Sequence, residues 1–289
     1  MVRFWLVALV MLAATGPGRT ADRLNVVASF SILGDFVRNV GGDRVDVTTL
    51  VGPNSDAHVY VPTPSDAKKV ADAKLIFVNG LGFEGWLSRL VKSAGGKASV
   101  VTATTGIAPL KLGSEADPHA WQSVVNAKIY VANIRDALIA ADPEGKATYE
   151  ANAKEFLERI AAMETTVKEA IAKLPPERRK IITTHDAFGY FGAAYGMEFI
   201  APEGVSTESE ASAKDVAKII RQIKAEKVPA VFLENVTDSR LLEQIAKETG
   251  AKIGGTLFSD ALSPPDGPAG TYLDMFRNNI ETMSEALSS

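Results

Sequence analysis

The sequence predicts an α/β protein of two lobes, each a mainly parallel sheet flanked by helices, joined by one long spanning helix. Short β-branched runs alternate with helical patterns in two successive series, which is typical of βαβ units. Between the two series lies the most regular apolar repeat of the 289-residue chain. We therefore expect an N-terminal lobe over residues 22–141, a linking helix over 142–175 and a C-terminal lobe over 176–289. A signal peptide over 1–21 precedes them.

The first lobe begins with alternating strand and helix signals. Runs rich in valine, isoleucine and threonine are bounded by polar and glycine-containing segments, as expected of buried strands. The predicted strands are Leu24–Phe30, Val45–Val51, Leu75–Asn79 and Ser99–Thr102. The predicted helices are Pro64–Ala73, Glu84–Ser93 and one that starts near Gln122 and carries Val125, Ile129, Ile134 and Leu138.

The linking helix is predicted by apolar residues that recur at intervals of three, four or seven. We expect Asp142 to cap this helix and Pro143 to be its first residue, where a missing N–H costs nothing. Pro175 and Pro176 end it. From Pro143 to Leu174 the helix would be about 48 Å long at ~1.5 Å per residue. The repeating apolar residues are Tyr149, Phe156, Ile160, Met163, Val167, Ile171 and Leu174.

The second lobe repeats the order of elements without repeating the sequence. Its predicted strands are Lys180–Thr184, Met197–Ala201, Ala230–Glu234 and Lys252–Leu257, and its predicted helices are Ala187–Tyr195, Ala213–Glu226, Ser239–Thr249 and Thr271–Ala286. Ligands of open α/β sheets bind beyond the carboxyl ends of the strands. Two such lobes facing each other therefore predict a binding site in the cleft between them.

The first 21 residues have the pattern of a secretory signal. Arg3 supplies a positive charge, the run from Phe4 to Ala14 is apolar, and small, helix-breaking residues follow. Such a run is shorter than the ~20 residues that a membrane span needs. We expect an exported protein that functions in the periplasm.

The composition excludes several classes of protein. A formal net charge of −4 argues against nucleic-acid binding, which needs a basic face. The chain contains no cysteine. This excludes disulfides, thiolate metal sites and attachment of a lipid to an N-terminal cysteine, so we expect no lipid anchor. The acidic surface suits a periplasmic monomer. Any metal must be held by nitrogen and oxygen.

The chain contains only three histidines, and each lies at a strand end or a helix start. His58 is in the loop after the strand Val45–Val51, His119 directly precedes a helix, and His185 ends a strand. Asp260 occupies the corresponding position after Lys252–Leu257. Three imidazoles and one carboxylate suit a near-tetrahedral Zn²⁺ site. We therefore predict that these four residues bind a metal ion.

An acidic residue lies close to each histidine in the sequence, namely Asp56, Asp117 and Asp186. Such acids are candidates to orient the second ring nitrogen of a metal-binding histidine, although aspartate is also ordinary in turns. Glu234, at the end of a predicted strand, is expected to have a surface or structural role.

Six segments in this order carry a family resemblance. They are DAHVY around His58, NGLGFEGW at 79–86, DPHAW around His119, THDAFGYFGAAYG around His185, FSDAL around Asp260 and TYLDMFRNNI at 271–280. The chain resembles the zinc/manganese-binding solute-binding proteins of metal ABC transporters (cluster A-I type). The resemblance implies two α/β lobes joined by a long helix, the same four metal ligands, and an inner-membrane ABC permease as partner.

The sequence departs from the family pattern at three places. Ala57 stands where the family usually has proline, and the segment Gly106–Asp117 lacks the histidine-rich loop of many zinc importers. At the third ligand, manganese members tend to have glutamate, whereas this chain has His185. Because Zn²⁺ binds nitrogen-rich sites more tightly than Mn²⁺, we predict zinc.

Binding is expected rather than catalysis, since no HExxH, GxSxG or P-loop motif is present. The alternatives are a manganese or iron receptor of the same family, a protein that binds an organic metal chelate, and a metal-dependent hydrolase. A periplasmic metal-donating protein is a further candidate partner.

Overall fold

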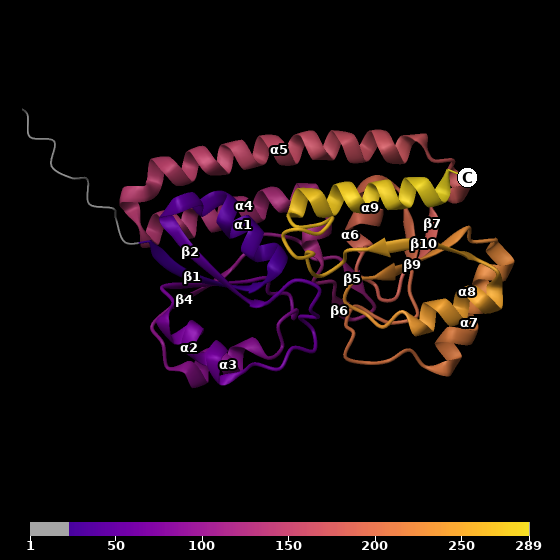
Figure 1. Cartoon of the computed structure of the whole chain (residues 1–289), viewed down its shortest axis with the longest axis horizontal. Coiled ribbons are helices and arrows are strands. Elements are labelled where there is room, and N and C mark those ends of the chain that lie inside the picture. The colour runs from indigo at the N-terminus through magenta and orange to yellow at the C-terminus, as the bar shows by residue number, and fades with distance from the viewer. Residues whose placement is uncertain (1–22, 289) are drawn as a thin grey trace, which may run out of the picture.

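The computed structural model describes residues 23–288, which form two α/β lobes side by side beneath one long helix (Figure 1). The predicted signal peptide, residues 1–21, lies outside the described residues. Each lobe has one four-stranded sheet in which every neighbouring pair is parallel. This is the predicted fold class.

The sheet of the first lobe has the order β2-β1-β3-β4. Its strands are β1 (Leu24–Phe30), β2 (Val45–Val51), β3 (Leu75–Val78) and β4 (Ser99–Thr102), all within one residue of the predicted bounds. The central strand β3 is entirely buried, as is most of β1. Loops follow the carboxyl ends of β2, β3 and β4.

Four helices surround this sheet: α1 (Ser31–Gly41), α2 (Pro64–Asp72), α3 (Leu87–Ala94) and α4 (Val124–Ala141). Helix α1 follows β1 without an intervening residue and was not among the predicted helices. Helix α2 begins with a capping box, in which Thr63 accepts a hydrogen bond from the Asp66 backbone and Asp66 accepts one from that of Thr63. A small hairpin, β5 (Lys111–Leu112) and β6 (Glu115–Ala116), precedes His119.

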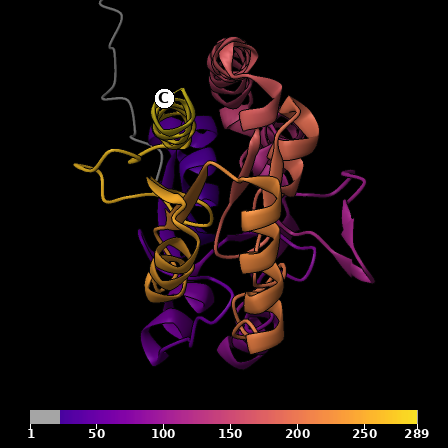
Figure 2. The same ribbon diagram turned by 90° about the vertical axis from the view of Figure 1, so that its right-hand side faces the viewer.

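The linking helix α5 (Lys146–Lys173) has 28 residues and is therefore about 42 Å long. It packs against α1 and α4 of the first lobe and against α6 and α9 of the second. Viewed from the end, α5 and α9 lie next to each other (Figure 2). A 3-10 turn (Pro143–Gly145) precedes it.

The predicted cap of this helix was wrong. The side chain of Asp142 makes no capping hydrogen bond. Its carboxylate instead accepts hydrogen bonds from Arg44 Nε, at 2.8 Å, and from Tyr149 Oη, at 2.7 Å. Both of these bonds end on Oδ2, and Arg44 Nη2 donates to Oδ1, at 3.0 Å. Asp142 therefore ties the start of the linking helix to the end of the turn before β2.

The sheet of the second lobe has the order β10-β9-β7-β8. Its strands are β7 (Lys180–Ile182), β8 (Glu198–Ile200), β9 (Ala230–Glu234) and β10 (Lys252–Leu257). Its helices are α6 (Gly189–Tyr195), α7 (Ala213–Glu226), α8 (Arg240–Thr249) and α9 (Tyr272–Leu287). The predicted elements are all present, with β7 and β8 shorter than expected.

The hydrophobic core is continuous between the lobes. One cluster of buried side chains includes residues of both sheets and the inner face of α5, from Val26 through Phe156 to Phe276. A smaller cluster around Ile182 and Ile219 fills the space between the second sheet and helices α7 and α8. Because the larger core is shared, we expect the lobes to unfold together. Within residues 23–288, no helix is both long and apolar enough to cross a membrane.

Candidate metal centre

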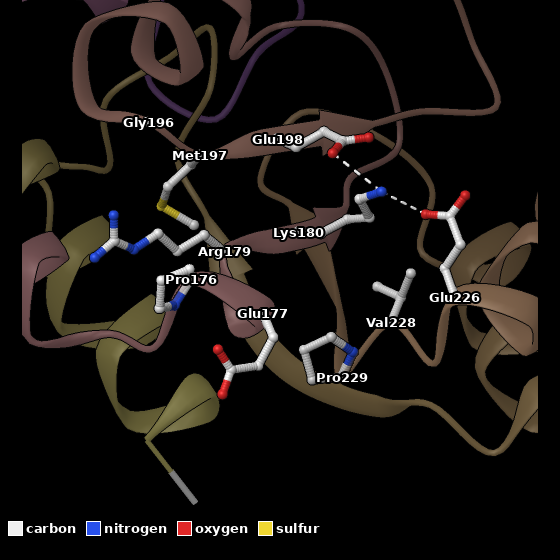
Figure 3. Close-up of a pocket in the computed structure, with 10 residues that line it drawn as sticks. All are labelled: Pro176, Glu177, Arg179, Lys180, Gly196, Met197, Glu198, Glu226, Val228 and Pro229. Carbon is white, nitrogen blue, oxygen red and sulfur yellow. Dashed lines mark hydrogen bonds and ion pairs between the residues drawn. The ribbon is translucent and has the colours of Figure 1, made fainter.

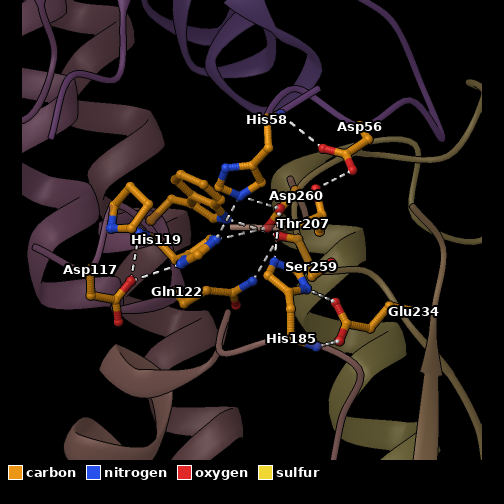
Figure 4. A network of polar contacts seen from close by, with 12 residues as sticks. Asp56, His58, Asp117, His119, Gln122, His185, Thr207, Glu234, Ser259 and Asp260 are labelled. Atoms are coloured by element: carbon orange, nitrogen blue, oxygen red, sulfur yellow. Dashed lines mark hydrogen bonds and ion pairs between the residues drawn. The ribbon is translucent and has the colours of Figure 1, made fainter. Parts of the chain in front are cut away.

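The four residues predicted to bind metal meet at one point between the lobes (Figure 4). His58 lies in the loop after β2, His119 just before α4 and its preceding 3-10 turn, His185 after β7, and Asp260 after β10. Each offers one ligand atom, and these atoms lie within 4.8 Å of one another. All four residues are buried, with at most 6% of their surface exposed.

The three histidines direct Nε2 at the carboxylate of Asp260. Oδ2 of Asp260 lies 3.2 Å from His58 Nε2 and 3.1 Å from His185 Nε2, and Oδ1 lies 3.5 Å from His119 Nε2. The Nε2 atoms of His58 and His119 are 3.3 Å apart. A tetrahedral ion with bonds of about 2.0–2.1 Å has its ligand atoms about 3.3–3.4 Å apart. The spacing of these atoms therefore suits a transition-metal ion at their centre.

Two histidines have a carboxylate against the ring nitrogen that faces away from this centre. His119 Nδ1 lies 2.8 Å from Asp117 Oδ1, as the sequence predicted for this acid. His185 Nδ1 lies 2.7 Å from Glu234 Oε2. A carboxylate at this position holds the proton on Nδ1 and leaves the Nε2 lone pair for a metal.

Glu234 was expected to have a surface or structural role, and the expectation of a surface position was wrong. Glu234 is 4% exposed, and its Oε1 accepts hydrogen bonds from the backbone N–H groups of Thr184, at 2.7 Å, and His185, at 3.0 Å. Strand β9 lies beside β7 in the sheet, which brings this strand-end acid against the strand-end histidine. The signal in the sequence was its position at a strand end, but the neighbouring strand could not be inferred from it.

The other two predicted acids do not touch a histidine ring among the described residues. Asp56 accepts a hydrogen bond from the backbone N–H of His58, at 2.8 Å, and another from Thr207 Oγ1 of the second lobe, at 2.5 Å. No hydrogen bond or ion pair joins Asp186 to a histidine ring among the described residues, and burial raises its pKa to about 6. Asp56 therefore positions the loop of His58, and the partner of His185 is Glu234 instead of Asp186.

Opposite charges dominate the electrostatics of the centre. Burial alone would raise the pKa of Asp260, but the neighbouring His185 and His119 together hold it well below its usual value. Burial would lower the pKa values of both rings, yet Glu234 and Asp260 raise that of His185, and Asp260 and Asp117 raise that of His119. A cation that binds these two rings therefore competes with protons.

Hydrogen bonds between the lobes fix the loop of Asp260. The carbonyl oxygen of Ser259 accepts hydrogen bonds from Trp121 Nε1, at 3.0 Å, and Gln122 Nε2, at 2.9 Å. The Trp121 ring is fully buried against Phe30 and Phe83, with centroids 4.9 Å away in each case. The segment that follows His119 therefore also holds the residue before Asp260.

A surface cavity of about 480 Å³ lies at the other end of the second sheet, at the amino ends of its strands (Figure 3). Lys180 in this cavity forms ion pairs with Glu198 and Glu226. The charge of Lys180 is thus compensated by these two glutamates. The described residues that can jointly hold a metal ion lie at the carboxyl ends instead.

Comparison with known proteins gives consistent results along most of the chain. The family model described as zinc-uptake complex component A, periplasmic, matches residues 26–286. The manganese-binding lipoprotein MntA of Halalkalibacterium halodurans is 34% identical, over 99% of this chain and 97% of the relative. The iron-binding protein YfeA of Yersinia pestis is 34% identical, over 97% of this chain and 91% of the relative.

The solved structure of the periplasmic zinc-binding protein TroA from Treponema pallidum superposes with a TM-score of 0.88 at 32% sequence identity. The match covers 92% of this chain and 99% of TroA. TroA therefore shares the architecture described above. The names of MntA, YfeA and TroA give manganese, iron and zinc, respectively, as the metals that they bind.

Proposed function

Because this chain belongs to the family of periplasmic zinc-uptake complex component A, we propose that it captures Zn²⁺ between its lobes and delivers it to an inner-membrane ABC-type import permease. Members of this family are metal-binding, substrate-binding components of ABC transporters and are not enzymes. We assign His58, His119, His185 and Asp260 as the ligands. The observation that carries this assignment is the convergence of three Nε2 atoms and one carboxylate at a buried point.

Zinc is proposed over manganese because of the donor set. Three imidazoles and one carboxylate are typical of zinc, whereas Mn²⁺ favours more oxygen ligands. Both oxygens of Asp260 face the centre, so a site with two carboxylate oxygens is the alternative, and it would suit manganese or iron. The relatives named for manganese and iron support this alternative, whereas TroA is named for zinc.

The burial of all four ligands implies how the ion is exchanged. Since at most 6% of each ligand residue is exposed, an ion at the centre is enclosed by protein. His58 and His119 belong to the first lobe, and His185 and Asp260 belong to the second. We infer that the loops or lobes part when the ion enters, and that docking on the permease parts them again for release.

A competition titration of untagged, metal-stripped protein with Zn²⁺ and Mn²⁺ tests this proposal. We expect one equivalent of tightly bound zinc and much weaker binding of manganese. Comparable or tighter binding of manganese would overturn the choice of metal. Absence of stoichiometric binding of either ion would overturn the receptor function itself.

The family acts outside the cytoplasm, and we propose the periplasm as the site of action. The relative MntA is named a lipoprotein, whereas this sequence contains no cysteine to which a lipid could be attached. We therefore predict that, unlike MntA, this protein is released into the periplasm without a lipid anchor.

A further inference from the structure

Glu234 uses its two carboxylate oxygens for two different tasks. Oε1 accepts the backbone N–H groups of Thr184 and His185, at 2.7 and 3.0 Å. Oε2 lies 2.7 Å from Nδ1 of the His185 ring. Both atoms are buried, and among residues 23–288 this close contact is the polar contact that each of them makes. Oε2 is therefore the nearest acceptor for a proton on Nδ1 of His185.

Asp117 serves His119 differently, through a single oxygen. Oδ1 of Asp117 lies 2.9 Å from the backbone N of His119 and 2.8 Å from its ring Nδ1. An amide in place of this carboxylate can keep its oxygen at the position of Oδ1 and accept both N–H groups. Its NH₂ group then takes the position of Oδ2, which has no contact with the His119 ring.

The same replacement at Glu234 has no such solution. A glutamine has one acceptor oxygen and one NH₂ group, but three N–H groups face the two oxygens of Glu234. If the amide oxygen remains on the two backbone N–H groups, its NH₂ group faces His185 Nδ1. The ring must then carry its proton on Nε2, where it points at the metal centre. An amide opposite a histidine is known to leave the geometry intact while selecting the wrong tautomer.

We propose that Glu234 is a positioning residue that keeps the proton of His185 on Nδ1 and so presents the Nε2 lone pair to the metal ion. This inference rests on the proposed function, since it assumes that His185 is a ligand. The two carboxylates beside the ring Nδ1 atoms then have unequal roles. Glu234 sets the tautomer of His185 through both its charge and its position, whereas a single acceptor oxygen of Asp117 is sufficient to orient His119.

Zinc affinity of untagged, metal-stripped variants tests the proposal, measured by competition with a chromophoric chelator. We expect Glu234→Gln to weaken zinc binding by about 100-fold or more, at or above the upper end of the range for outer carboxylates. Asp117→Asn should weaken it less than about tenfold. Glu203→Gln, measured at a pH above the Glu203 pKa of about 7, is the matched control, because it removes a negative charge that interacts with His185 only at a distance. It should weaken binding less than about threefold.

A double-mutant cycle separates positioning from a structural role. In the His185→Ala background, Glu234→Gln should change the remaining affinity by less than about threefold, since there is no ring left to orient. The proposal is overturned if Glu234→Gln weakens binding no more than Glu203→Gln does. It is also overturned if the factor is the same with and without the His185 ring.

A measurement on the unaltered protein covers the case in which Glu234→Gln does not fold. In zinc-loaded protein, the Nδ1–H of His185 should be observable by NMR and should exchange with water more slowly than the Nδ1–H of His58, because the only carboxylate contact of the His58 ring among the described residues is at Nε2. Equally fast exchange would contradict the proposal. If His185→Ala leaves zinc affinity unchanged, the assignment of the ligands fails instead, whereas a selective loss in that variant without one in Glu234→Gln overturns this inference alone.

Discussion

Replacing Trp121 by phenylalanine should lower the free energy of unfolding of metal-stripped protein by about 2 kcal/mol. The indole N–H donates to the carbonyl oxygen of Ser259 across the seam between the lobes, at 3.0 Å. Its loss removes one of two donors to a buried acceptor, which costs about 1 kcal/mol. The smaller ring also leaves a cavity of roughly 40 Å³, and at about 24 cal/mol per Å³ this adds about 1 kcal/mol.

The Ser259 carbonyl oxygen has a second donor, and the combined substitution of both donors tests this reasoning. Gln122 Nε2 donates to the same carbonyl at 2.9 Å. Gln122→Leu alone should cost about 1 kcal/mol because Trp121 still satisfies the acceptor. In the double variant the buried Ser259 carbonyl has neither donor, and an unsatisfied buried polar group costs about 1–3 kcal/mol. The loss of unfolding free energy in the double variant should therefore exceed the sum of the two single losses by at least about 1 kcal/mol.

Urea denaturation of the four proteins, followed by far-UV circular dichroism, measures these energies. We expect one cooperative transition in each case, since the larger hydrophobic core spans both lobes. Effects that add within about 0.5 kcal/mol would refute the shared-acceptor account. Two separate transitions would refute the shared core.

Three further predictions concern the site and its surroundings. His185→Ala should weaken zinc binding by orders of magnitude and Asp186→Ala only slightly, because His185 belongs to the cluster of ligand atoms and Asp186 does not; equal losses in a chelator competition would relocate the site. The raised pKa values of His119 and His185 stabilise the metal-free protein fully below about pH 6.5, and this contribution is lost as the pH rises through the raised values. Its melting temperature should therefore fall between pH 6 and 9 in chelator, whereas zinc affinity should fall on acidification; a flat affinity between pH 5 and 8 would argue against histidine ligands. Finally, gentle osmotic shock of the native host should release the protein in soluble form, and retention in the membrane fraction would indicate an anchor.

Much of the site was readable from the sequence because its residues lie at strand ends. The strands β1, β2, β4, β9 and β10 have the predicted bounds, and the loops after them necessarily gather at one edge of each sheet. The histidines were few enough to be placed individually. This is why the convergence of His58, His119, His185 and Asp260 could be predicted without knowledge of the order of the strands.

The remaining features depend on contacts between distant parts of the chain. Glu234 reaches His185 only because β9 lies between β10 and β7, an order that no local pattern encodes. Asp142 has the local pattern of a helix cap, but Arg44, 98 residues away, takes its carboxylate. Asp186 is next to His185 in the sequence, yet the carboxylate against the His185 ring is that of Glu234. Proximity in sequence therefore identified Asp117 correctly and Asp186 wrongly.

The assignment of the ligands is tested most directly by anomalous diffraction from a zinc-loaded crystal on both sides of the zinc absorption edge. We predict one strong peak between the lobes, about 2.0–2.2 Å from Nε2 of His58, His119 and His185 and from the carboxylate of Asp260. A peak at any other group of residues, or none at all in protein shown to contain zinc, would contradict the assignment of this centre.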